Sequence, residues 1–127
     1  MTTASIASAK YQVKLQNGRH EFVADEPRDQ GGEDTGPSPD ELLEAALASC
    51  TVITLRMYAD RKQWPVASID ARVTLERTEG KTLFTRHISI NGNISEEQQQ
   101  RLLQIARSCP VSKTLAGEIE VNSFVGN

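Results

Sequence analysis

The chain has 127 residues, a formal net charge of −3 at pH 7 and two cysteines. That length is enough to bury a core as one domain spanning residues 1–127, without metal or disulfide staples. No cluster of Lys and Arg is present, which argues against a nucleic-acid partner, because affinity for phosphate depends on clustered positive side chains.

The N-terminal stretch MTTASIASAKYQVKL has no charged segment followed by a continuous apolar run, and no stretch approaches the roughly eighteen uninterrupted apolar residues of a membrane span. We therefore expect a soluble, cytoplasmic protein without a membrane partner. In that reducing compartment a disulfide between Cys50 and Cys109 would be transient and catalytic rather than structural.

The first third of the chain predicts a hairpin and a loop. The segments YQVKL and HEFVA flank Asn17-Gly18, a pair that readily supplies the positive φ angles of a tight hairpin turn. RDQGGEDTGPS follows, and its Gly, Asp and Pro content without periodicity predicts a surface loop.

A long helix is predicted from Ser38 to about Lys62. Ser38 stands at the cap, Pro39 at the first helical position and Glu41 at the third, which together form a helix-start signal. Its apolar residues lie on nearly all sides, as in a helix buried all round: Leu42, Leu43, Ala46, Leu47, Val52, Ile53, Leu55 and Met57. Because a small domain cannot surround such a helix, we expect a second copy of the chain to cover part of it in a homodimer.

Two further strands are predicted after this helix. The alternation from Ile69 to Glu76 indicates a strand with one wet face, and a turn over residues 78–81 leads into a second strand, LFTRHISI. Arg86 shares the phase of the apolar residues of that strand. It could point inward as a partner for a thiolate, but we expect its stem to pack on the sheet and its charged end to lie in water.

The last third predicts a helix, a break and a closing strand. Ser95 with Gln98 forms a capping box that opens the helix, and Pro110 interrupts it. PVSKTLA then forms a short helix that ends at Gly117, with Cys109 at its cap. EIEVNSFV is the predicted closing strand. This order of elements predicts an α+β fold in which antiparallel hairpins cover helices.

Two interpretations stay open for each cysteine. A buried cysteine is commonly an inert small hydrophobe. A reactive Cys50 needs a nearby cation, because it lies about three turns into its helix, beyond the reach of the helix dipole. Arginine suits that role, since it stays charged when partly buried. Cys109 precedes a proline at a helix cap and could serve as a partner thiol that attacks an oxidised Cys50.

Other uses of these side chains are weakly supported. His20 and His87 could join the cysteines as zinc ligands, but the four residues are scattered singly and lack the paired spacing of a zinc site. A hydrolase with Cys50 as nucleophile and a histidine base lacks an identifiable third, orienting residue.

The segments GPSPDELLEAALASC and CPVSKTLAGEIEV resemble the two signatures of the OsmC/Ohr family of osmotically inducible and organic hydroperoxide resistance proteins. The resemblance extends from about Phe22 to the C-terminus, and the second motif looks more like the OsmC branch. It implies an OsmC-like fold, with antiparallel sheets wrapped around two central helices in an intertwined homodimer. It also implies a thiol peroxidase of oxidative stress defence that reduces organic hydroperoxides, is reset by an external dithiol reductant and needs no metal or organic cofactor.

The resemblance also suggests roles for individual residues. Cys50 matches the peroxidatic cysteine and Cys109 the resolving one. Asp40, in Ser-Pro-Asp, stands where the family has glutamate in Asn-Pro-Glu, so its carboxylate is one methylene shorter. Arg28 matches the activating arginine of OsmC-like members, whereas Arg19 matches that of Ohr-like members only loosely, and we favour Arg28.

Each of these charged residues also has a simpler interpretation. An arginine in a loop is commonly a solvated surface residue. Asp40 could serve only as a first-turn carboxylate that complements the helix dipole. It lies about 15 Å along the helix from Cys50, so it could act on the thiol only through an arginine or across the dimer.

The mechanism implied by the resemblance starts with attack of the Cys50 thiolate on the peroxide. The resulting sulfenic acid is converted by Cys109 to a disulfide, which the dithiol reduces. Ile53 and Met57 would line a pocket that favours organic peroxides. Two alternatives from other classes stay open: a non-catalytic OsmC-like module that binds a small lipophilic ligand, and a thiol redox sensor.

Overall fold

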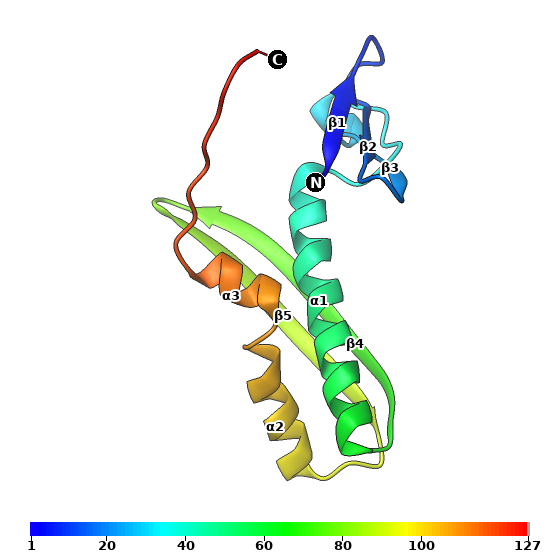
Figure 1. Ribbon diagram of the computed structural model, residues 1–127, viewed down its shortest axis with the longest axis vertical. Coiled ribbons are helices and arrows are strands. Elements are labelled where there is room, and N and C mark those ends of the chain that lie inside the picture. The colour runs from blue at the N-terminus through cyan, green and yellow to red at the C-terminus, as the bar shows by residue number, and fades with distance from the viewer. Residues whose placement is uncertain (127) are drawn as a thin grey trace. The chain divides into compact units, whose positions relative to one another are not determined.

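The computed structural model describes residues 1–126 and has an α+β architecture, as predicted (Figure 1). Its elements are β1 (Thr3–Ile6), β2 (Val13–Gln16), β3 (Glu21–Ala24), the short 3₁₀ helix η1 (Arg28–Gln30), α1 (Pro39–Lys62), β4 (Val66–Thr78), β5 (Lys81–Gly92), α2 (Glu96–Ala106) and α3 (Pro110–Ala116). The chain separates into two compact units, Met1–Ala45 and the part from Ala46 onward, and α1 belongs to both. That residues 1–127 act as one domain stays a prediction.

The first unit contains an antiparallel sheet in the order β1-β2-β3. The predicted hairpin is β2–β3. Its register pairs Gln16 with Glu21, and the Asn17 N–H donates to the His20 carbonyl oxygen at 3.1 Å, which closes the predicted tight turn over Gly18 and Arg19. The Asn17 side-chain oxygen accepts hydrogen bonds from the backbone N–H groups of Arg19 (3.0 Å) and His20 (2.8 Å). The asparagine therefore closes the loop with its side chain, while Gly18 supplies the positive φ of 93°.

Strand β1 was not predicted. Its sequence, TASI, is short and lacks an alternation of polar and apolar residues, and all four residues are exposed. It forms because β2 offers a free edge, along which Thr3 pairs with Gln16 and Ile6 with Val13. Tertiary pairing therefore decides this strand, with little contribution from its own sequence.

The predicted loop after β3 is organised around the buried carboxylate of Asp25. This group accepts hydrogen bonds from the Glu26 N–H (2.7 Å), the Thr35 N–H (3.2 Å) and the Thr35 hydroxyl (2.6 Å). Gly32 packs so closely on the Glu26 carbonyl that a Cβ there would lie 2.0 Å from its oxygen. The loop is therefore held in one path, and Arg28 begins the short helix η1 within it.

Helix α1 begins as predicted. The Ser38 hydroxyl accepts from the Glu41 N–H (3.2 Å), and the Glu41 carboxylate accepts from the Ser38 N–H (2.9 Å), which completes a reciprocal capping box. The single chain leaves part of α1 uncovered, as expected for a domain too small to surround this helix. Only the stripe Leu47, Thr51, Leu55 and Ala59 is buried.

The side of α1 opposite to this stripe is not covered by the single chain. Ile53 is 57% exposed and Met57 60% exposed. By length and composition alone α1 could cross a membrane. Its buried stripe nevertheless contributes Leu55 and Ala59 to a core shared with α2, which is the packing of a core helix.

The second unit is built on a long antiparallel hairpin, β4–β5, with α1 and α2 lying over the same face of the hairpin (Figure 1). The core consists of Leu55, Ala59, Val66, Leu102 and Ala106, with Ile69, Ile88 and Ile90 of the sheet packed against it. Both strands extend beyond their predicted ends and meet at the predicted turn, where Gly80 has a φ of 73°.

The two C-terminal helices form as predicted. Ser95 and Gln98 make the capping box of α2, with both reciprocal bonds present. Pro110 opens α3, and Cys109 caps it with an extended ψ of 142°. The proline forces this geometry, because its ring disfavours helical backbone at the preceding residue.

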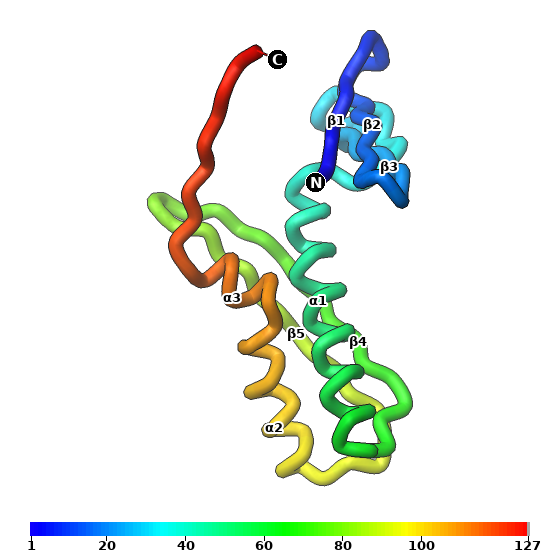
Figure 2. Tube along the Cα trace, viewed as in Figure 1, coloured from blue at the N-terminus to red at the C-terminus, as the bar shows by residue number. Residues whose placement is uncertain are grey.

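The predicted closing strand is wrong for the single chain. Residues 118–126 form no helix or strand and run as an extended trace after α3 (Figure 2). Val121 is 81% exposed and Phe124 92% exposed. A strand is stabilised by hydrogen bonds to a neighbouring strand, and within the described residues no strand pairs with this segment.

Candidate functional site

Both cysteines are free thiols in the second unit. Cys50 lies in α1 and is half-buried, beside the fully buried Thr51. Cys109 is fully buried at the N-terminal cap of α3. The two thiols are therefore 59 positions apart in sequence, and both residues belong to the same compact unit.

Arg86 contacts Cys109 and Thr51, the residue that follows Cys50 in sequence. Its Nη1 donates a hydrogen bond to the Thr51 hydroxyl oxygen at 3.0 Å and lies 3.9 Å from the Cys109 sulfur. The Thr51 hydroxyl in turn donates to the Leu47 carbonyl oxygen at 2.7 Å. The expectation that the charged end of Arg86 lies in water is therefore wrong: the guanidinium reaches inward to a buried hydroxyl and a buried thiol.

Three local rules bring these groups together. The alternation of β5 places Phe84, Arg86 and Ile88 on the face that carries the helices. Thr51 belongs to the buried stripe of α1, four residues from Leu47, so its hydroxyl faces the same interior. The break before Pro110 turns Cys109 inward at the start of α3. The only sequence feature that could have predicted the inward orientation of Arg86 is its phase with the apolar residues of β5. For Thr51, no sequence feature other than its place on the buried face of α1 indicates a role.

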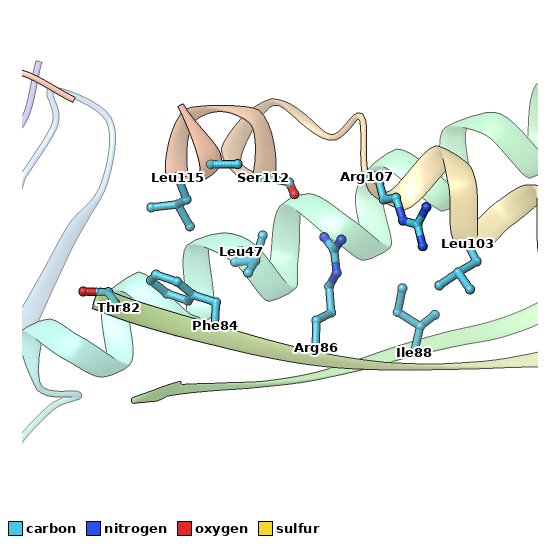
Figure 3. A pocket seen from close by; sticks show the side chains of 10 residues that line it. Leu47, Thr82, Phe84, Arg86, Ile88, Leu103, Arg107, Ser112 and Leu115 are labelled. Carbon is cyan, nitrogen blue, oxygen red and sulfur yellow. The ribbon is translucent and has the colours of Figure 1, made fainter. Parts of the chain in front are cut away.

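A pocket of about 430 Å³ lies beside this group and is shown in Figure 3. Its walls come from α1, β5, α2 and α3, and its lining is Leu47, Thr82, Phe84, Arg86, Ile88, Leu103, Arg107, Ser112, Leu115 and Ala116. In Figure 3 the Arg86 side chain rises from β5 toward the helices, while Arg107 reaches in from the end of α2. The pocket therefore combines apolar walls with two guanidinium groups.

Ile53 and Met57, the predicted pocket residues, line a different hollow. It has a volume of about 330 Å³ and is shared with Val52, Arg56 and Ile69. Because both side chains are more than half exposed, this hollow is an open apolar surface of the single chain.

The charged residues predicted for the site all lie in the first unit. Arg19 is exposed in the β2–β3 loop, and Arg28 is exposed at the start of η1. Asp40 is half-buried in the first turn of α1. The contact of an arginine with Cys50, and the part that Asp40 plays in it, stay predictions. Among residues 1–126, no three His, Cys, Asp or Glu side chains gather as a candidate metal site.

Solved structures share this architecture over most of their length. An OsmC-like protein of Mycoplasma pneumoniae superposes with a TM-score of 0.79 at 21% identity, over 92% of this chain and 86% of that one. An organic hydroperoxide resistance protein of Elizabethkingia anophelis gives 0.69 at 25% identity, over 94% and 89%. The organic hydroperoxide resistance protein OhrB of Bacillus subtilis gives 0.63 at 25% identity, over 92% and 90%.

No curated protein matches the chain. The family model described as OsmC-like protein matches residues 31–123, a span that contains the helix with Cys50, the hairpin with Arg86 and the Cys-Pro motif at Cys109. With that match over most of its length, and with the α+β architecture of the solved OsmC and Ohr structures, the chain belongs to the OsmC/Ohr family.

Proposed function

We propose that this protein is a cysteine-based peroxidase that reduces organic hydroperoxides to alcohols in oxidative stress defence. The observation that carries the proposal is the buried Cys109 thiol beside the Arg86 guanidinium, which is anchored on Thr51, the residue that follows Cys50. An inert packing cysteine needs no cation, whereas a reacting thiol works as a thiolate. The names of the Elizabethkingia anophelis and Bacillus subtilis proteins support hydroperoxides as the substrate class.

The reaction begins at Cys50. Its thiolate attacks one peroxide oxygen, the S–O bond forms as the O–O bond breaks, and the departing alkoxide takes a proton to leave as the alcohol. Cys50 is thereby oxidised to a sulfenic acid. Arg28 is the favoured activating cation and Arg19 the alternative, with Asp40 holding the guanidinium.

The second half of the reaction uses Cys109. Its thiolate attacks the Cys50 sulfur, the S–S bond forms as the S–O bond breaks, and the departing hydroxide takes one proton to leave as water. An external dithiol then reduces the disulfide by two exchange steps and is itself oxidised to a disulfide. None of these steps requires a metal or an organic cofactor.

The protein is proposed to work as a homodimer. The apolar side of α1 around Ile53 and Met57 is exposed in one chain, and so are the apolar side chains of residues 118–125. Exposed apolar surface of this extent is typical of a surface that a partner covers. A second copy would cover both regions and surround α1, as the all-round pattern of its sequence predicts.

The test is a single-turnover thiol count on the full chain. With one equivalent of cumene hydroperoxide, both free thiols of the wild type should disappear together. Cys109→Ser should stop at a sulfenic acid on Cys50 that a dimedone probe traps, and Cys50→Ser should keep its Cys109 thiol. If the wild-type thiols are unchanged after this treatment, the peroxidase proposal is wrong.

A second candidate function rests on the 430 Å³ pocket. Its apolar walls and two arginines would suit a small lipophilic ligand in a module whose cysteines are idle. The same thiol count separates the two functions, because a binding module keeps both thiols. A redox sensor would form the disulfide once and turn over slowly, which steady-state kinetics with a recycling dithiol would reveal.

A further inference from the structure

Arg86 is a half-buried cation without a carboxylate partner. It lies on the inner face of β5, and among the described residues no Asp or Glu forms an ion pair with it. Its two contacts at Nη1 are the Thr51 hydroxyl and the Cys109 sulfur. A partly desolvated charge is costly when unpaired, so this guanidinium is best satisfied when one of its neighbours becomes an anion.

Of those two neighbours, Cys109 carries the more acidic type of group, because a thiol is a stronger acid than an alcohol. The Thr51 hydroxyl already donates its proton to the Leu47 carbonyl, so it offers Arg86 a lone pair and stays neutral. The Cys109 sulfur, fully buried and 3.9 Å from Nη1, is the atom that can take up negative charge beside the cation. Thr51 thus fixes the position of the guanidinium, and the positive charge of the guanidinium lies next to the Cys109 sulfur.

The anchor also relates the two halves of the reaction. Thr51 is the residue directly after Cys50 on α1, while Cys109 starts α3. The arginine that contacts the Cys109 sulfur is therefore hydrogen-bonded to the residue that follows, in sequence, the cysteine whose oxidised form Cys109 must attack. A guanidinium suits this double contact, because one Nη carries two N–H donors in fixed directions.

We propose that Arg86, anchored by Thr51, positions Cys109 and stabilises it as the thiolate that attacks the Cys50 sulfenic acid. This role rests on the proposed function and refines it by assigning a separate arginine to each half-reaction. Arg28 or Arg19 serves the reaction of Cys50 with hydroperoxide, and Arg86 serves disulfide formation. In the step assigned to Arg86, the Cys109–Cys50 bond forms, the S–O bond of the sulfenic acid breaks, and the oxygen leaves as water after protonation.

The test measures the two half-reactions separately in the full-length protein. After one equivalent of cumene hydroperoxide, the rise of dimedone-reactive sulfenic acid reports on Cys50, and the loss of that signal with gain of disulfide reports on Cys109. Arg86→Met should leave the first rate within about threefold and slow the second by about 10- to 100-fold, the scale of one charge-assisted hydrogen bond. Arg86→Lys, which keeps the charge, should recover part of the loss.

Arg72→Met is the matched control. Arg72 lies on the solvent face of β4, so this variant makes the same chemical change in the same hairpin without touching a thiol. Both of its half-reaction rates should equal those of the wild type. Thr51→Val removes the anchor while keeping Arg86, and it should slow disulfide formation by a smaller factor than Arg86→Met.

A measurement without peroxide separates this role from a merely structural one. In Cys50→Ser protein, the neighbouring cation should favour alkylation of Cys109 by anionic iodoacetate over neutral iodoacetamide. The ratio of the two rates should fall several-fold when Arg86→Met is added, because changes in access to the thiol affect both reagents alike.

Wild-type disulfide formation in the Arg86→Met variant, or an unchanged alkylation ratio, would overturn the role of Arg86 and leave the peroxidase intact. If the number of free thiols in the wild type does not change after treatment with hydroperoxide, the proposed function is overturned instead. In that case the ratio of the two alkylation rates still tests whether the positive charge of Arg86 acts on the Cys109 thiol.

Discussion

At the scale of single residues, buried polar groups define both the site and the loop before α1. In the second unit Thr51 and Cys109 are buried against Arg86. In the first unit Asp25 is the buried group, and its acceptors are satisfied by backbone and side-chain donors of the same loop. Buried polar atoms that find partners in this way fix one local conformation, because the alternatives leave a donor or acceptor unpaired.

Asp25 gives the protein a stability that depends on pH. The hydrogen bond from the Thr35 hydroxyl lowers the pKa of Asp25 below its ordinary value of 3.8, with help from the backbone N–H groups of Glu26 and Thr35 and against the opposing effect of burial. A carboxyl group whose folded pKa is depressed stabilises the fold above its unfolded pKa and loses that contribution as pH falls through the folded value. Asp25→Asn should therefore lower the urea midpoint at pH 7 and lose this difference from the wild type below pH 3.8.

Asp29→Asn is the control for this experiment. Asp29 is exposed in η1 of the same loop, so its substitution should change the urea midpoint little at any pH. A gap between wild type and Asp25→Asn that stays constant from pH 7 to pH 3 would contradict the role of the ionised carboxylate.

At the scale of elements, α1 and α2 each have one face that the single chain buries and another that it leaves open. In α2, two adjacent leucines lie on the buried and the open face. Leu102 is fully buried in the core with Leu55 and Ala106, whereas Leu103 is 44% exposed and lines the pocket beside Arg86. The helix thus packs with one side chain and contributes a pocket wall with the next.

These two leucines allow a matched test of the packing. Leu102→Ala should lower the free energy of unfolding by about 2–5 kcal/mol, because it leaves a cavity in the core. Leu103→Ala removes the same atoms from a partly exposed position and should cost no more than about 1 kcal/mol. Urea unfolding of both variants measures the difference, and equal losses would show that the core does not lie where the structure places it.

At the scale of the whole molecule, the open features of one chain lie where a second copy is expected. The apolar residues Ile53 and Met57 are exposed on α1, and the segment after α3 carries exposed apolar side chains without a neighbouring strand. Surfaces of this kind are rarely left in water by a folded protein. A second copy that covers both regions would bury these side chains, as the proposed dimer requires.

The dimer is tested by solution mass. At micromolar concentration the wild type should have the mass of two chains by analytical ultracentrifugation. Ile53→Glu should give a folded monomer, because it places a charge on the apolar side of α1. Arg72→Glu, on the solvent face of β4, should remain a dimer. A stable wild-type monomer would refute the proposal.

Most elements of the fold could be predicted from local signals. Ser38 with Glu41 and Ser95 with Gln98 mark helix starts by satisfying backbone N–H groups from nearby side chains, and Pro110 breaks the chain by its ring geometry. The two cysteine motifs were likewise readable, and they led to the family that the match over residues 31–123 shows. These signals work because their causes lie within a few residues of one another.

The sequence by itself determined the helices, the β4–β5 hairpin, the family and the candidate thiols. Only the tertiary structure decided that Arg86 turns inward to Thr51 and Cys109, that β1 forms along β2, and that residues 118–126 lack a partner in one chain. The physical reason is the separation along the sequence between the groups that stabilise each feature. A cap or a turn is stabilised by its own neighbours. The edge strand β1 and the half-buried guanidinium of Arg86 are instead stabilised by groups 7 to 35 positions away, which no local pattern specifies.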